Sequence, residues 1–181
     1  MNVPPQDDEP LAELELARHR DLTGRRWGPL AIRTVIAILA TFVILAALNV
    51  FGQQPSTSSA ASQTARMDVS TPSRLRGGLI FQTRVDVQAL RAIAKPTLVL
   101  GGGWFDGMTL NSYQPPAANQ ASRGKAVTFS YPPLAAGAHM TVWLEWSVNP
   151  TNVAWDSSEP IQLDDGQRQL VELAPSVTVF P

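Results

Sequence analysis

Residues 140–148, MTVWLEWSV, decide the fold, because apolar and polar side chains alternate along them with a period of two. Successive side chains of a β-strand point to opposite faces of a sheet, so this pattern predicts a strand with one face in a hydrophobic core. Trp146 belongs to the apolar series and is predicted to be the core tryptophan. Trp143 belongs to the opposite series, with Thr141 and Glu145, and is predicted to lie on the other face.

Strand-like stretches of the same kind occur on both sides of this segment. They are residues 79–88, 97–100, 126–131, 161–163, 169–173 and 177–180. Glycine- and proline-containing turns separate them, and Asp164-Asp165-Gly166 predicts a hairpin. Only residues 87–95 have a helical pattern, which Pro96 ends. About seven short strands within residues 77–181 predict an all-β, antiparallel Ig-like β-sandwich whose strand order stays open.

Residues 131–150, YPPLAAGAHMTVWLEWSVNP, contain a leucine, a spacer and a glycine before the long alternating strand. This segment resembles the late strand–turn–strand unit of bacterial extracytoplasmic Ig-like and CARDB-type adhesion modules. The resemblance implies a β-sandwich with a scaffolding role, and it implies no catalytic residues. The cysteine pair of antibody domains is missing, since the chain has no cysteine.

A long apolar segment precedes the β-rich region. Residues 34–50, TVIAILATFVILAALNV, carry no charge, and residues 30–51 contain only Arg33. A helix of 22 residues is about 33 Å long, which matches a hydrocarbon core of about 30 Å. The stem of Arg33 lets its guanidinium reach the headgroups from the first turn. Residues 30–51 are therefore predicted to form one transmembrane α-helix, in preference to the core helix of a soluble protein.

Arginines on one side of this segment predict its orientation. Arg18, Arg20, Arg25, Arg26 and Arg33 lie on the N-terminal side, whereas no Lys or Arg follows until Arg66. The positive-inside rule then makes residues 1–29 a cytoplasmic tail and places the C-terminal part in the periplasm or outside the cell. Trp27 is expected at the membrane interface. The prediction is a single-pass protein of the cell (inner) membrane with an uncleaved signal anchor; the alternative is a signal peptide cleaved after Ser59-Ala60-Ala61.

Residues 52–65, GQQPSTSSAASQTA, are uncharged, rich in Ser, Thr, Gln and Ala, and aperiodic. Such a composition is typical of a flexible tether. The sequence therefore predicts a flexible linker over residues 52–76 and a β-sandwich domain over residues 77–181.

The composition argues against several kinds of chemistry. A net charge of −1 does not favour nucleic-acid binding, and the absence of cysteine removes thiolate metal sites and cysteine nucleophiles. His139 is the only histidine after the apolar segment, and no G-x-S-x-G motif accompanies it. The carboxylates Asp156, Glu159, Asp164 and Asp165 lack the spacing of a calcium loop. A noncatalytic protein without cofactor or metal is expected.

Aromatic side chains are the best candidates for an interaction surface. Trp104 and Phe105 lie in the glycine-rich stretch 101–107, GGGWFDG, which predicts a mobile or bulged connection between strands. Trp143 and Trp155 complete the set, because tryptophan is enriched at interaction hot spots. Two functions follow as hypotheses. The first is a membrane-anchored β-domain that binds a membrane-protein partner or scaffolds a complex. The alternative is an envelope module that binds glycan or cell-wall material; the oligomeric state stays open.

Overall fold

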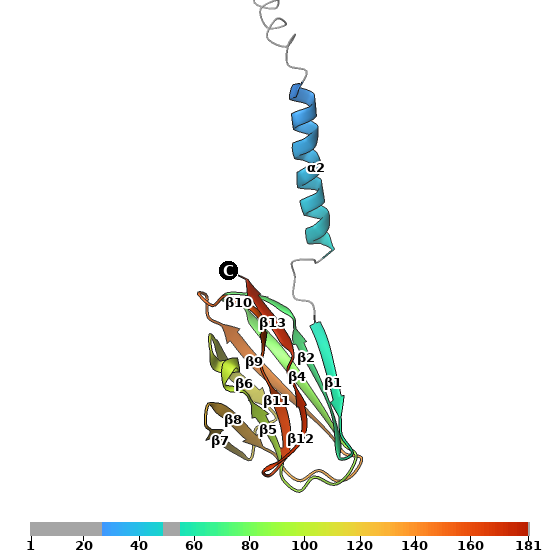
Figure 1. The fold of residues 1–181 in the computed structure, drawn as a ribbon, viewed down its shortest axis with the longest axis vertical. Helices are drawn as coiled ribbons and strands as arrows, with labels where there is room; N and C mark the ends of the chain where they lie inside the picture. Colours follow the sequence, from blue (N-terminus) through green and yellow to red (C-terminus); the bar gives the residue numbers. More distant parts are fainter. Residues whose placement is uncertain (1–26, 49–54, 181) are drawn as a thin grey trace, which may run out of the picture. The chain divides into compact units, whose positions relative to one another are not determined.

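The computed structural model describes residues 27–48 and 55–180 (Figure 1). The chain divides into two compact units, residues 1–50 and residues 51–181. The predicted tail falls outside the described residues up to residue 26, as do residues 49–54 and Pro181.

The first unit contains one α-helix, α2 (Trp27–Ala47). Its Gly28–Ala47 segment has a mean hydropathy of 2.4, and none of that segment is buried within the protein. The hydroxyls of Thr34 and Thr41 donate hydrogen bonds to the carbonyl oxygens of Leu30 and Ala37, four residues earlier. The helix therefore satisfies its own polar groups, as a helix in lipid must. Its length and composition suit a membrane anchor or a signal sequence.

The second unit is an antiparallel β-sandwich, which confirms the predicted fold class. Its strands are β1 (Pro55–Ala61), β2 (Ala65–Pro72), β3 (Arg74–Arg76), β4 (Ile80–Ala89), β5 (Pro96–Leu100), β6 (Met108–Gln114), β7 (Asn119–Arg123), β8 (Ala126–Ser130), β9 (His139–Val148), β10 (Ala154–Ser158), β11 (Ile161–Asp165), β12 (Arg168–Leu173) and β13 (Ser176–Phe180). A 3₁₀ helix, η1 (Gly102–Phe105), lies between β5 and β6.

Two five-stranded sheets form the sandwich. Their strand orders are β1-β2-β4-β9-β6 and β12-β11-β5-β8-β7. A smaller sheet, β10-β13-β3, contains the parallel pair β13 and β3. The predicted hairpin is confirmed between β11 and β12, where Gly166 has a φ of +65° that suits glycine.

The core lies on the inner faces of the strands, with β4 and β9 at its centre. Trp146 is fully buried, as its place in the alternation predicts. Its indole stacks on Trp104 and Phe81 at centroid distances of 5.4 and 6.5 Å, and Phe105 tilts against it at 5.5 Å. One aromatic cluster therefore joins β4, β9 and η1.

The predicted linker over residues 52–76 is wrong for most of its length. Residues 55–76 form β1, β2 and β3, and β2 pairs with β1 over seven residues and with β4 over six. The inner face of β2 is buried through four small or medium side chains: Ala65, Met67, Val69 and Thr71. The domain therefore begins at β1 rather than at residue 77, because tertiary pairing overrides a composition that is typical of a tether.

Two smaller predictions also need correction. Residues 87–95 do not form a helix, because β4 continues to Ala89 and a bridge between Ile93 and Leu134 follows. Leu79 precedes β4 and is exposed, whereas Phe81, Thr83, Val85 and Val87 face the core as predicted.

Tyr131 gives the domain a pH dependence at high pH. The residue is 5% exposed, and its hydroxyl has no hydrogen-bond partner among the described residues. Desolvation by burial, followed by the electrostatic effect of Tyr113, raises the pKa of Tyr131 to about 12. A tyrosine in the unfolded chain titrates near about 10, so the folded state holds this proton more tightly. We expect the stability contributed by Tyr131 to be full below about pH 10 and to fall by about 1.4 kcal/mol per pH unit up to about pH 12.

Chemical denaturation between pH 10 and pH 12 measures this effect. The Tyr131→Phe variant should lose stability less steeply than the wild type over that range. Equal slopes for the two proteins would contradict the assignment to Tyr131.

Candidate interaction site

Trp143 lies on the outer face of the sheet β1-β2-β4-β9-β6, as predicted, and its side chain is 43% exposed. It stands in the middle of β9 between Arg84 of β4 and Gln114 of β6, its partners in the two neighbouring ladders. The guanidinium carbon of Arg84 lies 5.6 Å from the centroid of the indole. This is a cation–π contact, in which a planar cation rests against an aromatic face.

Neighbouring side chains hold Arg84 in this position. Its Nε donates to Oδ2 of Asp86 at 2.6 Å, and the hydroxyl of Thr141 donates to Oδ1 of the same carboxylate at 2.7 Å. The outer face of the sheet therefore presents an ordered guanidinium and indole pair rather than a free arginine.

An open groove of about 650 Å³ runs beside this pair. We refer to it as the Trp143 groove. The residues that line it are Pro55, Ser70, Thr71, Pro72, Ile80, Phe81, Gln82, Arg84, Trp143 and Glu145. They come from β1, β2, β4 and β9, so the segment that the sequence assigns to a linker forms one wall. An exposed aromatic thus lies among hydrogen-bonding side chains on a rigid sheet.

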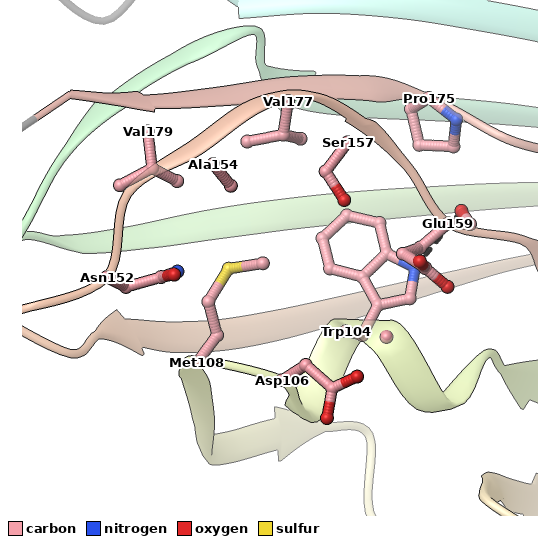
Figure 2. Close-up of a pocket in the computed structure, with 11 residues that line it drawn as sticks. Trp104, Asp106, Met108, Asn152, Ala154, Ser157, Glu159, Pro175, Val177 and Val179 are labelled. Atoms are coloured by element: carbon pink, nitrogen blue, oxygen red, sulfur yellow. Dashed lines mark hydrogen bonds between the residues drawn. The ribbon is translucent and has the colours of Figure 1, made fainter.

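Trp104 is not part of an interaction surface, contrary to the prediction. It is 1% exposed, and its Nε1 donates to the carbonyl oxygen of Glu159 at 3.2 Å. Figure 2 shows its indole beside a small pocket lined by residues such as Met108, Val177 and Val179. The cavity measures about 20 Å³, enough for about one water molecule and too small for an organic ligand.

Glycines explain why this connection folds inward instead of forming a mobile loop. η1 brings Trp104 under β9, and the backbone of Gly102 passes so close to Lys125 that an added Cβ would lie 2.6 Å from the lysine Cβ. A Cβ added at Gly103 would lie still closer to the carboxylate of Glu159. The glycine-rich stretch therefore permits tight packing. Phe105 is half-buried, because its ring packs against Trp146, so it is not a fully exposed aromatic either.

Trp155 is 71% exposed and lies on β10, at the edge of the small sheet. Its ring meets Phe180 edge-on at a centroid distance of 5.4 Å. Trp143 and Trp155 thus belong to different sheets, and the four predicted aromatics do not form one surface. Sequence reasoning missed Arg84 and Gln82, although the alternation in residues 79–88 places both on the outer face.

The ionisable residues weighed for catalysis or metal binding lie apart. His139 is exposed at the start of β9. Asp164 is buried in an ion pair with Arg123 at 2.8 Å, Asp165 accepts a hydrogen bond from the backbone N–H of Lys95, and Asp156 accepts one from Ser176. Among the described residues, no group of three or more His, Cys, Asp or Glu side chains is arranged to hold a metal ion.

No protein-family model and no curated protein sequence matches the chain. Solved structures similar to it include the chitin-binding domain of a chitinase from Pyrococcus furiosus, with 15% identity over 64% of this chain and 100% of that chain and a TM-score of 0.38.

A non-cellulosomal cohesin from Archaeoglobus fulgidus shares 9% identity over 71% of this chain and 92% of that chain, with a TM-score of 0.40. A CARDB domain from Pyrococcus furiosus, solved with di-metal ions, shares 12% identity over 68% and 95% of the two chains, with a TM-score of 0.38. A CARDB domain, the type of module that residues 131–150 resemble, is thus among the similar structures. The fold defines the class: an Ig-like β-sandwich module preceded by one apolar helix.

Proposed function

We propose that the protein is a noncatalytic, single-pass membrane protein whose exported β-domain binds a protein partner through the Trp143 groove. In this role it is a scaffolding or accessory subunit of a membrane complex. The observation that carries the proposal is the Trp143–Arg84 pair, an exposed indole and an anchored guanidinium beside an open groove on a regular sheet. Tryptophan and arginine dominate the energetic centres of protein interfaces.

The membrane anchor of this proposal is α2. The helix is long enough to cross the hydrocarbon core, and its only charged residue, Arg33, lies near its N-terminal end. The arginines that precede it favour a cytoplasmic N-terminus. The β-domain would then face the periplasm or the outside of the cell.

The position of Arg84 favours a protein over a glycan as occupant of the groove. Sugars stack on a free aromatic face, whereas the guanidinium of Arg84 lies over one face of the indole of Trp143. A protein segment can instead contact the edge of the indole and the remaining donors of the guanidinium, since arginine has five N–H donors and Asp86 uses only one.

We expect Trp143→Ser to weaken partner binding strongly. Loss of a central tryptophan typically costs about 2 kcal/mol or more, which is about a 30-fold loss of affinity. The measurement is recovery of the partner with the full-length protein extracted in mild detergent. Trp155→Ser is the matched control, because it removes an exposed tryptophan of the same domain from a different sheet. Equal recovery with wild type, Trp143→Ser and Trp155→Ser would contradict the proposal.

Glycan binding is the second candidate, and the polar lining of the groove favours it. Ser70, Gln82 and Glu145 surround Trp143 with hydroxyl, amide and carboxylate groups that suit sugar hydroxyls. Titration of the full-length protein with envelope glycans, followed by tryptophan fluorescence, separates the two functions. A saturable change that disappears in Trp143→Ser would replace the protein partner by a glycan.

A further inference from the structure

Exposed apolar side chains gather at one end of the β-sandwich. Strand registers define this end, because Pro55 of β1 faces Pro72, and the backbone N–H groups of Gly77 and Gly78 donate to the carbonyl oxygens of Phe180 and Val148. The starts of β1, β4 and β10 and the ends of β9 and β13 therefore lie together there (Figure 1). We refer to it as the Trp155 end, made of Leu79, Ile80, Val153, Trp155 and Phe180.

This end holds four of the six large apolar side chains that are exposed among the described residues of the β-domain. Trp155 and Ile80 are the most exposed of these six, at 71% and 61%. Leu90 at the opposite end and Trp143 on the sheet face are the other two. Clustered exposed apolar residues mark a surface that contacts another molecule or a membrane, whereas scattered ones do not.

Local geometry directs Trp155 outward. The pairing of β10 with β13 is irregular between Ala154 and Ser157, and Asp156 has a φ of +49°, a rare conformation for a residue with a side chain. Bulges of this kind at a sheet edge turn side chains to new directions. The arginines Arg74 and Arg76 of β3 are exposed beside the same end.

The short segment between α2 and β1 limits how far this end can lie from the end of the helix. Eight peptide steps separate Ala47, the last residue of α2, from Pro55, the first residue of β1. Such a stretch spans at most about 28 Å when fully extended. A helix that crosses a bilayer therefore keeps the start of β1, and with it the Trp155 end, within reach of the same membrane.

We infer that the Trp155 end rests on the lipid headgroups of the membrane that α2 crosses, an inference that depends on the proposed anchor. Tryptophan and arginine are the residues that prefer this layer, where an indole lies at headgroup level and a guanidinium meets lipid phosphate. The Trp143 groove reaches this end through Pro55, Pro72 and Ile80. Its Trp143–Arg84 pair lies further along the sheet, with Arg84 four residues beyond Ile80 on β4, and stays available to a protein partner.

Site-specific quenching in lipid nanodiscs tests the contact with the full chain. Because the chain has no cysteine, Thr151→Cys places one fluorophore in the turn at the Trp155 end, and Ala136→Cys places one in the turn before β9, at the other end. The ten residues of β9 separate these turns by about 33 Å, beyond the reach of a headgroup nitroxide. We expect nitroxide lipids to quench the label at residue 151 and not the label at residue 136.

Adding Ile80→Ser and Trp155→Ser should abolish quenching at residue 151, whereas adding Trp143→Ser should leave it unchanged. Equal quenching at the two labels, or quenching that persists without Ile80 and Trp155, would overturn the inference. Co-migration of the chain with the nanodiscs tests the anchor separately. A chain that does not insert overturns the anchor and the inference together, whereas an inserted chain without quenching at residue 151 overturns the inference alone.

Discussion

Removal of residues 55–76 will prevent the β-domain from folding. Strand β2 buries Met67 and Val69 and pairs with β4 over six residues. Burial of two such side chains contributes about 3–6 kcal/mol. Their loss also exposes Val85 and Val87 on the inner face of β4. Since domains of this size have a net stability of about 5–15 kcal/mol, the remaining sandwich is not expected to hold.

The comparison is between fragments 52–181 and 77–181. The longer fragment should unfold cooperatively with urea and show a dispersed NMR spectrum, whereas the shorter one should be unfolded or aggregated. If fragment 77–181 folds cooperatively, residues 52–76 are a linker, as the sequence predicts, and the strands β1, β2 and β3 are not needed for the domain. That result would refute the present account of these strands.

Trp146→Ala will lower the stability of the β-domain by about 3–5 kcal/mol, the usual cost of removing a large aromatic side chain from a core. Trp146 contacts Phe81, Trp104 and Phe105, so its removal leaves a cavity where β4, β9 and η1 meet. Urea denaturation of the full-length protein in detergent, monitored by the signal of the β-domain, gives the difference.

Trp143→Ala is the matched control, because it removes the same side chain from the same strand three residues away. Its effect on stability should stay within about 1 kcal/mol, since Trp143 is 43% exposed on the outer face of the sheet and lies outside the core. Similar losses for both variants would mean that Trp143 is as important for the core as Trp146, and the distinction between the two faces of β9 would fail.

Period-two alternation makes the centre of the fold predictable. β9 has ten residues with a fully apolar inner face, and β4 beside it repeats the pattern. Both strands lie inside their sheet with neighbours on each side, so burial imposes the pattern strongly. The burial of Trp146 and the exposure of Trp143 follow directly from it.

The strands β1 and β2, at one edge of the sandwich, could not be predicted from the sequence, and the reason is physical. β1 is an edge strand of Ser, Thr and Ala with one neighbour, so little burial constrains its residues. β2 fills its inner face partly with small or polar groups, and the hydroxyls of Thr71 and Thr83 bond to each other at 3.0 Å inside the core. In the sequence alone, threonines that form a buried hydroxyl pair cannot be told from threonines in a solvent-exposed segment.

The place of Trp104 could not be predicted from its local sequence. Its hydrogen-bond partner, the carbonyl of Glu159, lies 55 residues further along the chain, and its stacking partner Trp146 lies on β9. Glycines on either side suggest mobility when read locally, yet here they permit close packing. Of the four predicted aromatics, only Trp143, together with Arg84, remains in the candidate interaction site. Trp155 lies at a separate end of the β-domain.

Cross-linking in native membranes tests the proposed partner site most directly. A cysteine at Gln82, in the Trp143 groove, is compared with one at Gln88, six residues further along the same face of β4 and about 20 Å away. A short cysteine-reactive photo-cross-linker should give one protein adduct of defined mass from residue 82, absent from residue 88 and lost when Trp143→Ser is added. The same adducts from both positions, or none from residue 82, would contradict the account.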